Sequence, residues 1–279
     1  MLRKLILIFA GIIAIILFIG FAVSAFFLFT NYTQLPDIST LPSHIWWTIY
    51  SPQTGTSLLW KLVGIAGLQL FSIIAGFILL WFYIKTSSFE IFFFTLFLFT
   101  LSLEGARILQ LFIQLEAQPT YFGVVVTRFI YFARLFDLCM IFLASLLSTG
   151  IKNQKIGFQL GISFLLSFFL AYTIPIDTLD MSSDLLYQAG DERNLAFLCI
   201  TAQVFAVLNL FVSGILKQHK NYSYMGIGVL LALTGRELIF FLTNPVTIAS
   251  SLALLITGAV IFTIYANSLY LWSERNLQF

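Results

Sequence analysis

Residues 89–150 read FEIFFFTLFLFTLSLEGARILQLFIQLEAQPTYFGVVVTRFIYFARLFDLCMIFLASLLSTG. The turn sequence Glu116-Ala117-Gln118-Pro119 separates two long apolar runs, which predicts two antiparallel membrane-spanning helices. Five charged side chains lie within these runs: Glu104, Arg107, Arg128, Arg134 and Asp137. A charge at the bilayer centre costs about 2.5–3.5 kcal/mol even on a lenient scale. We therefore expect these side chains to pair, to face a polar cavity or to bind a ligand.

The composition of the whole chain is typical of an integral membrane protein. Of its 279 residues, 60% are hydrophobic and 9% are charged, whereas soluble domains carry about 25% charged residues. Eight apolar runs are long enough to cross a bilayer, at roughly 5–30, 57–84, 88–115, 120–149, 156–175, 195–216, 223–243 and 246–272. We predict an all-α integral membrane protein with eight transmembrane helices in one membrane domain. The lipid bilayer is its expected partner, and its scattered basic residues indicate no nucleic acid.

The positions of lysine and arginine predict the orientation of the chain. If the eight spans alternate, most of the basic residues outside the spans fall on one side of the membrane: Arg3, Lys4, Lys85, Lys152, Lys155, Lys217, Lys220 and Arg275. Basic residues accumulate on the cytoplasmic side, so we expect both termini in the cytoplasm. Lys61, at the outer end of the second span, departs from this rule. The first span resembles a signal peptide, but its apolar core is longer than usual, and we expect it to be retained.

Several short patterns occur twice in the same order. Tyr32-Thr33, with a proline and an aspartate after it, corresponds to Tyr172-Thr173. Residues 104–107, Glu-Gly-Ala-Arg, correspond to residues 235–237, Gly-Arg-Glu. This order favours a tandem duplication of four plus four spans, with repeats 1–150 and 151–279. The alternative is that tyrosine, proline and aspartate simply favour helix ends.

Two outer loops carry further signals. Trp46, Trp47 and Tyr50 favour a segment at the level of the lipid headgroups, although a ligand lid would also fit. Asp177, Asp180 and Asp184 have helical spacing, which predicts a shared acidic face open to solvent. A calcium site would need more oxygen ligands at closer spacing.

The charged residues of the spans form a predicted polar centre. Glu104 with Arg107, and Arg134 with Asp137, are each spaced to bridge along one helix. Arg236 and Glu237 lie at a similar depth in the seventh span. Together with Arg128 the set holds one excess positive charge, and arginine suits the binding of a carboxylate or phosphate. Three interpretations stay open: a structural salt-bridge network, a site for a small anionic or zwitterionic ligand, or an ion or proton path.

Catalytic, metal and cofactor signals are not found in the sequence. It contains neither an HExxH nor a GxSxG motif, and both histidines, His44 and His219, fall in predicted loops. Cys139 and Cys199 lie inside apolar spans, where cysteine is usually a small packing residue. We expect a protein that is not an enzyme and that binds no metal or cofactor.

Spans two to eight resemble the seven-span sensory modules at the front of many bacterial signalling proteins. The likeness is carried by Leu101-Ser102-Leu103-Glu104, by the short turn after that span, and by the run Arg128-Phe-Ile-Tyr-Phe-Ala-Arg-Leu-Phe136. It covers about a quarter of the chain. The resemblance implies a receptor-like bundle in a bacterial plasma membrane. Such modules usually feed an attached output domain, whereas this chain ends at Phe279, so we expect its output to pass to a separate protein partner.

The leading hypothesis is a receptor-like bundle that binds a small polar or anionic ligand from the outer side. Its site would comprise Glu104, Arg107, Arg128, Arg134, Asp137, Arg236 and Glu237. One alternative is a transporter with two four-helix repeats, although no glycine or proline break occurs at matching mid-span positions. The other is a non-catalytic subunit that scaffolds a larger complex.

Overall fold

The computed structural model describes residues 2–31, 58–149, 156–190, 192–241 and 244–276. The predicted headgroup-level segment with Trp46, Trp47 and Tyr50 lies outside the described residues. So does Tyr32-Thr33, the first copy of one of the repeated patterns.

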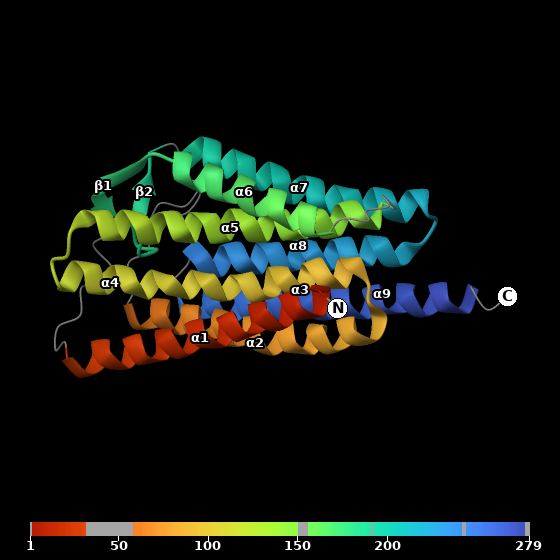
Figure 1. The fold of residues 1–279 in the computed structure, drawn as a ribbon, viewed down its shortest axis with the longest axis horizontal. Helices are drawn as coiled ribbons and strands as arrows, with labels where there is room; N and C mark the ends of the chain where they lie inside the picture. Colours follow the sequence, from red (N-terminus) through yellow and green to blue (C-terminus); the bar gives the residue numbers. More distant parts are fainter. Residues whose placement is uncertain (1, 32–57, 150–155, 191, 242–243, 277–279) are drawn as a thin grey trace.

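The described chain is almost entirely helical. Its elements are α1 (Leu2–Asn31), α2 (Leu58–Thr86), α3 (Phe89–Leu101), η2 (Ser102–Arg107), α4 (Ile108–Leu115), α5 (Thr120–Ser148), α6 (Ile156–Thr173), β1 (Ile176–Met181), β2 (Tyr187–Ala189), α7 (Glu192–Leu216), α8 (Lys220–Phe241) and α9 (Pro245–Asn276). Within the described residues, eight helical segments are long and apolar enough to cross a membrane, with α3, η2 and α4 forming the third. The helices run side by side in one elongated bundle (Figure 1). The predicted all-α, multi-span class is confirmed.

The third span lies at the centre of this bundle. In its most apolar stretch of 18 residues, 89% of the residues are buried, whereas 22% are buried in the corresponding stretches of α1 and α6. Phenylalanines at positions 92, 93, 94 and 97 are fully buried, and the Phe94 ring stacks on Phe262 of α9 with 3.9 Å between centroids. Since this span packs against protein on nearly all of its surface, its charged side chains must find partners inside the bundle.

Small residues bring α8 and α9 into close contact. A Cβ atom on Gly235 would lie 2.6 Å from the Ser251 backbone oxygen, and one on Gly228 would lie 2.8 Å from the Gly258 oxygen. Helices in membranes use such small residues to let their backbones approach. This contact sets the position of α8, and with it the position of Arg236 and Glu237.

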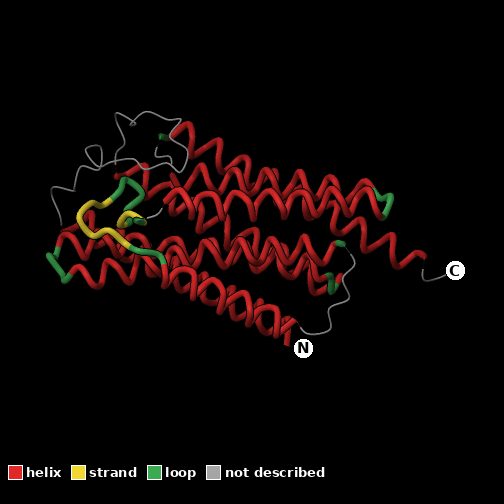
Figure 2. Tube along the Cα trace, turned by 90° about the horizontal axis from the view of Figure 1, so that it is seen from above, coloured by secondary structure: helices red, strands yellow, loops and turns green. Residues whose placement is uncertain are grey.

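A short β-hairpin closes one end of the bundle. β1 pairs antiparallel with β2, and Figure 2 shows these strands at one end of the helices. The prediction that Asp177, Asp180 and Asp184 share a helical face is wrong, because these residues belong to the hairpin. All five residues of the turn between the strands are buried: Ser182, Ser183, Asp184, Leu185 and Leu186. The turn therefore inserts into the bundle, while Leu179 of β1 stays exposed.

Candidate functional site

The third span changes helix type where its charges lie. Residues Ser102–Arg107 form a 3₁₀ segment between α3 and α4. In a 3₁₀ helix residues three apart are eclipsed, so Glu104 and Arg107 share one face. Gln69 of α2 approaches at Gly105, and its Nε2 donates to the Ser102 carbonyl at 3.0 Å. A Cβ on Gly105 would overlap that nitrogen, so this close approach requires glycine.

Three arginines and three carboxylates meet in a buried cluster, which we call the charge cluster: Glu104, Arg107, Arg134, Asp137, Arg236 and Glu237. Arg134 of α5 reaches Glu237 of α8 with 2.5 Å between Nη2 and Oε2. Arg236 lies 2.8 Å from a carboxylate oxygen of both Asp137 and Glu237. Glu104 is shared more loosely, at 3.3 Å from Arg107, 3.6 Å from Arg134 and 3.7 Å from Arg236. The cluster thus joins three spans with no net charge.

Two expected details of this cluster are wrong. Arg128 does not belong to it, because its guanidinium lies over the Tyr172 ring of α6, 4.8 Å from the centroid. The predicted pairing of Asp137 with Arg134 along α5 is also replaced, since Asp137 forms its ion pair with Arg236 on α8. Without Arg128 the charge cluster holds three arginines and three carboxylates. The predicted excess of one positive charge is therefore not found in it.

The structure adds Lys61 of α2, a basic residue that departs from the orientation rule. This lysine is 2% exposed, and its Nζ donates to the Phe240 carbonyl at 2.6 Å. Arg107 also donates to that carbonyl, at 3.4 Å. Phe240 is the penultimate residue of α8, where carbonyls lack donors within the helix and the helix dipole is negative. A charge inside an apolar span was the signal that could have placed Lys61 in the site.

The Phe240 side chain also belongs to the site, and no sequence pattern indicated it. Its ring lies 3.6 Å from the Arg134 guanidinium carbon and 4.3 Å from that of Arg107, measured to the ring centroid. Both contacts are within the range of cation–π attraction, which strengthens when the cation is desolvated. One residue therefore holds three cations through its ring and its carbonyl.

The hairpin turn covers the cluster at the Lys61 end. Leu186 packs with Ile130 and Phe240, and the Tyr187 backbone N–H donates to Thr127 of α5 at 3.3 Å. The Asp184 carboxylate acts electrostatically on both Lys61 and Arg107, but no ion pair within 4.0 Å joins it to either among the described residues. Lys61 and Asp184 carry one charge of each sign. The charge cluster together with these two residues therefore has no net charge.

Gln110 is a further polar side chain at this end, one turn beyond Arg107. It is fully buried, and in the part of the chain that the structure describes, neither its amide oxygen nor its nitrogen has a hydrogen-bond partner. The nitrogen lies 2.8 Å from where a Cβ of Gly123 would be, and the Tyr187 ring lies 2.5 Å from the same point. A buried amide without a partner is costly and calls for an explanation.

This arrangement can bind or position charge. Across the described ranges, no three His, Cys, Asp or Glu side chains lie close enough to hold a metal ion. Comparison with protein-family models, curated proteins and solved structures found no significant match. A function for this chain therefore has to be inferred from the geometry of the site.

Proposed function

We propose that this protein is a receptor-like, non-enzymatic bundle that binds a small anionic ligand beside Lys61 and Arg107 and signals to a separate protein partner. By its resemblance to bacterial sensory modules it would lie in a bacterial plasma membrane, and by the distribution of its basic residues both termini would lie in the cytoplasm. The ligand would then enter from the outer side, where the hairpin lies.

The observation that carries the proposal is the buried position of the Lys61 ammonium group. Its buried ammonium group has a carbonyl as hydrogen-bond acceptor, and among the described residues no carboxylate lies within ion-pairing distance of it. Burying a charge without an opposite charge in contact costs several kcal/mol. A ligand carboxylate or phosphate placed between Lys61 and Arg107 would offset that cost.

Two neighbours support a ligand at this position. Gln110 would supply an amide that has no other partner among the described residues. Asp184 on the hairpin supplies a negative charge that acts on the same two cations without touching them. An incoming anion would compete with Asp184 for these cations, and so would couple binding to the position of the hairpin.

The test is the melting temperature of the purified protein in detergent, at constant ionic strength, with phosphate, sulfate, acetate or succinate added. We expect at least one anion to raise it in a saturable way, since a ligand that binds only the folded state stabilises it. Lys61→Met should abolish the rise, whereas Lys61→Arg should retain part of it. Lys220→Met, which removes an exposed lysine at the start of α8, is the matched control. No rise with any anion, or an equal rise in Lys61→Met, would refute the proposal.

A second candidate function is a scaffold subunit, and the closed charge cluster favours it. Each of the three arginines pairs with at least one of the three carboxylates, so the cluster can hold the spans together without a ligand. A partner that copurifies in a fixed ratio, together with no response to any anion, would support this second function.

A further inference from the structure

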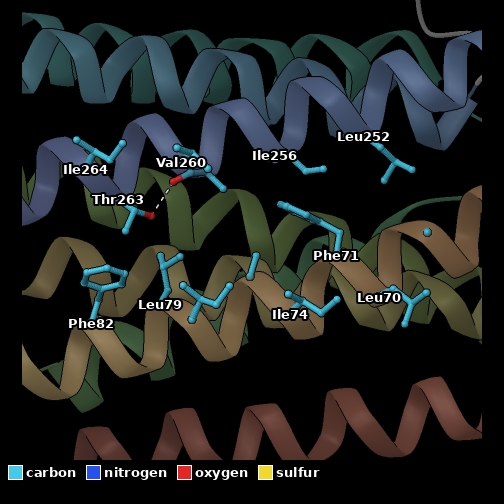
Figure 3. Close-up of a pocket in the computed structure, with 14 residues that line it drawn as sticks. Leu70, Phe71, Ile74, Leu79, Phe82, Leu252, Ile256, Val260, Thr263 and Ile264 are labelled. Atoms are coloured by element: carbon cyan, nitrogen blue, oxygen red, sulfur yellow. Dashed lines mark hydrogen bonds between the residues drawn. The ribbon is translucent and has the colours of Figure 1, made fainter.

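A groove with an apolar lining lies between α2 and α9. It has a volume of about 610 Å³. Small residues, among them Gly67, Ala75 and Ala259, line it between larger side chains such as Ile74 and Val260. Figure 3 shows the side chains of the two helices facing each other across this space. The groove therefore runs between larger side chains of the two helices.

The lining allows only an apolar occupant. Among the described lining residues, Thr263 alone has a polar side chain, and its hydroxyl donates to the Ala259 carbonyl at 2.6 Å. An occupant can thus find little hydrogen bonding with the side chains that line the groove. Because a polar group buried without a partner is costly, the inner part of the occupant must be hydrocarbon.

The length of the groove fits an extended acyl chain. From Gly67 to Phe82 the groove follows α2 for about 22 Å at 1.5 Å per residue. An extended acyl chain can lie along this length, between the larger side chains of α2 and α9.

A cation lies at one end of the same face. Lys85 follows Gly67 by 18 positions, which at 100° per residue is five full turns, so it continues the face of α2 that lines the groove. Its Nζ lies 3.5 Å from the centroid of the Trp81 ring, and no carboxylate within the described ranges forms an ion pair with it. Trp81 is 53% exposed, as expected of tryptophan at the level of the lipid headgroups.

We propose that this groove binds an anionic phospholipid, with one acyl chain between α2 and α9 and the phosphate beside Lys85. The apolar lining selects the chain, and the charge of Lys85 selects an anionic headgroup over a zwitterionic one. By the predicted orientation, this lipid belongs to the cytoplasmic leaflet. The site is independent of the ligand proposed beside Lys61.

The test is native mass spectrometry of the protein in detergent with equal amounts of phosphatidylglycerol and phosphatidylcholine. We expect one retained lipid, with phosphatidylglycerol several-fold more abundant. Lys85→Gln should remove that preference. Ala75→Phe fills the groove from α2 and should remove the retained lipid. Val260→Phe fills it from α9 and serves as the test if Ala75→Phe fails to fold. Gly20→Phe is the matched control, because no neighbouring atom of the described chain lies within 4 Å of a Cβ at that position on α1.

Two results would overturn the proposal. One is equal retention of both lipids in the unmodified protein and in Lys85→Gln. The other is a lipid-free dimer that Ala75→Phe dissociates, since it would make the groove a contact between two copies of the chain.

Discussion

Glu104 and Arg107 lie in the interrupted span of α3, η2 and α4, whereas Arg236 and Glu237 lie in the continuous helix α8. The 3₁₀ geometry of η2 eclipses the first pair, so Arg107 bonds to the backbone oxygen and the carboxylate of Glu104. The second pair is adjacent in sequence, about 100° apart around α8. Arg236 therefore reaches Asp137 of α5, and Glu237 reaches both Arg134 of α5 and Gln203 of α7.

The Glu104–Arg107 pair is mainly a contact within one helix turn, whereas Arg236 and Glu237 mainly bridge between helices. The pair in η2 holds its own turn together and reaches α5 and α8 only through polar contacts of 3.4 Å or longer. The pair in α8 ties α5, α7 and α8 to one another through contacts of 2.8 Å or shorter. It also bears on the transporter alternative, because transporters of the repeat type place interruptions in corresponding helices of both halves. In this chain η2 interrupts the third span, while its counterpart under the predicted duplication, α8, is continuous from Lys220 to Phe241.

We expect the largest effect from Arg236→Met. It removes a cation with two carboxylate contacts at 2.8 Å and leaves Asp137 and Glu237 buried with less compensation. Breaking a buried ion pair from one side costs about 3–5 kcal/mol. The melting temperature in detergent should fall further than in Arg107→Met, whose contacts are longer. An equal fall in the two variants would contradict the distinction between bridging and local pairs.

A smaller effect is expected from alanine at the glycine beside each pair. In Gly235→Ala the new methyl group meets the backbone of α9, 2.6 Å from the Ser251 oxygen and 2.9 Å from the Leu255 nitrogen. The two helices must separate, which costs about 1–3 kcal/mol. In Gly105→Ala the methyl group meets the end of the Gln69 side chain, which can move.

Thermal unfolding of the two alanine variants measures this contrast. Gly235→Ala should melt at the lower temperature. The double variant Gly105→Ala with Gln69→Ala should be less destabilised than the sum of its single changes, because the two sites are in contact. If the destabilisation of the double variant equals the sum of the two single changes, contact with Gln69 is not the reason that position 105 requires glycine.

The smallest effect is expected from Arg128→Gln. This side chain lies outside the charge cluster, and its cation–π contact with Tyr172 is worth about 0.5–1 kcal/mol at a partly exposed site. The melting temperature should change little, in contrast to Arg134→Gln, which removes the contact with Glu237. A similar loss in both variants would place Arg128 inside the network after all.

Part of the candidate site could be predicted from the sequence. Charges in apolar spans are costly enough to be conspicuous, so Glu104, Arg107, Arg134, Asp137, Arg236 and Glu237 stood out. Phe240 did not, because an aromatic ring in a membrane helix is ordinary. Asp184 was misplaced, since its spacing to Asp177 fits a helix, whereas the chain forms a hairpin whose turn is buried.

The sequence by itself determined the number and approximate limits of the membrane spans. The thickness of a bilayer sets the length of apolar chain needed to cross it, and this requirement is written locally along the chain. Only the tertiary structure decided which cation meets which carboxylate. That choice depends on the rotation and depth of each helix, which are set by contacts between distant residues, such as Gly235 against Ser251 and Gln69 against Gly105.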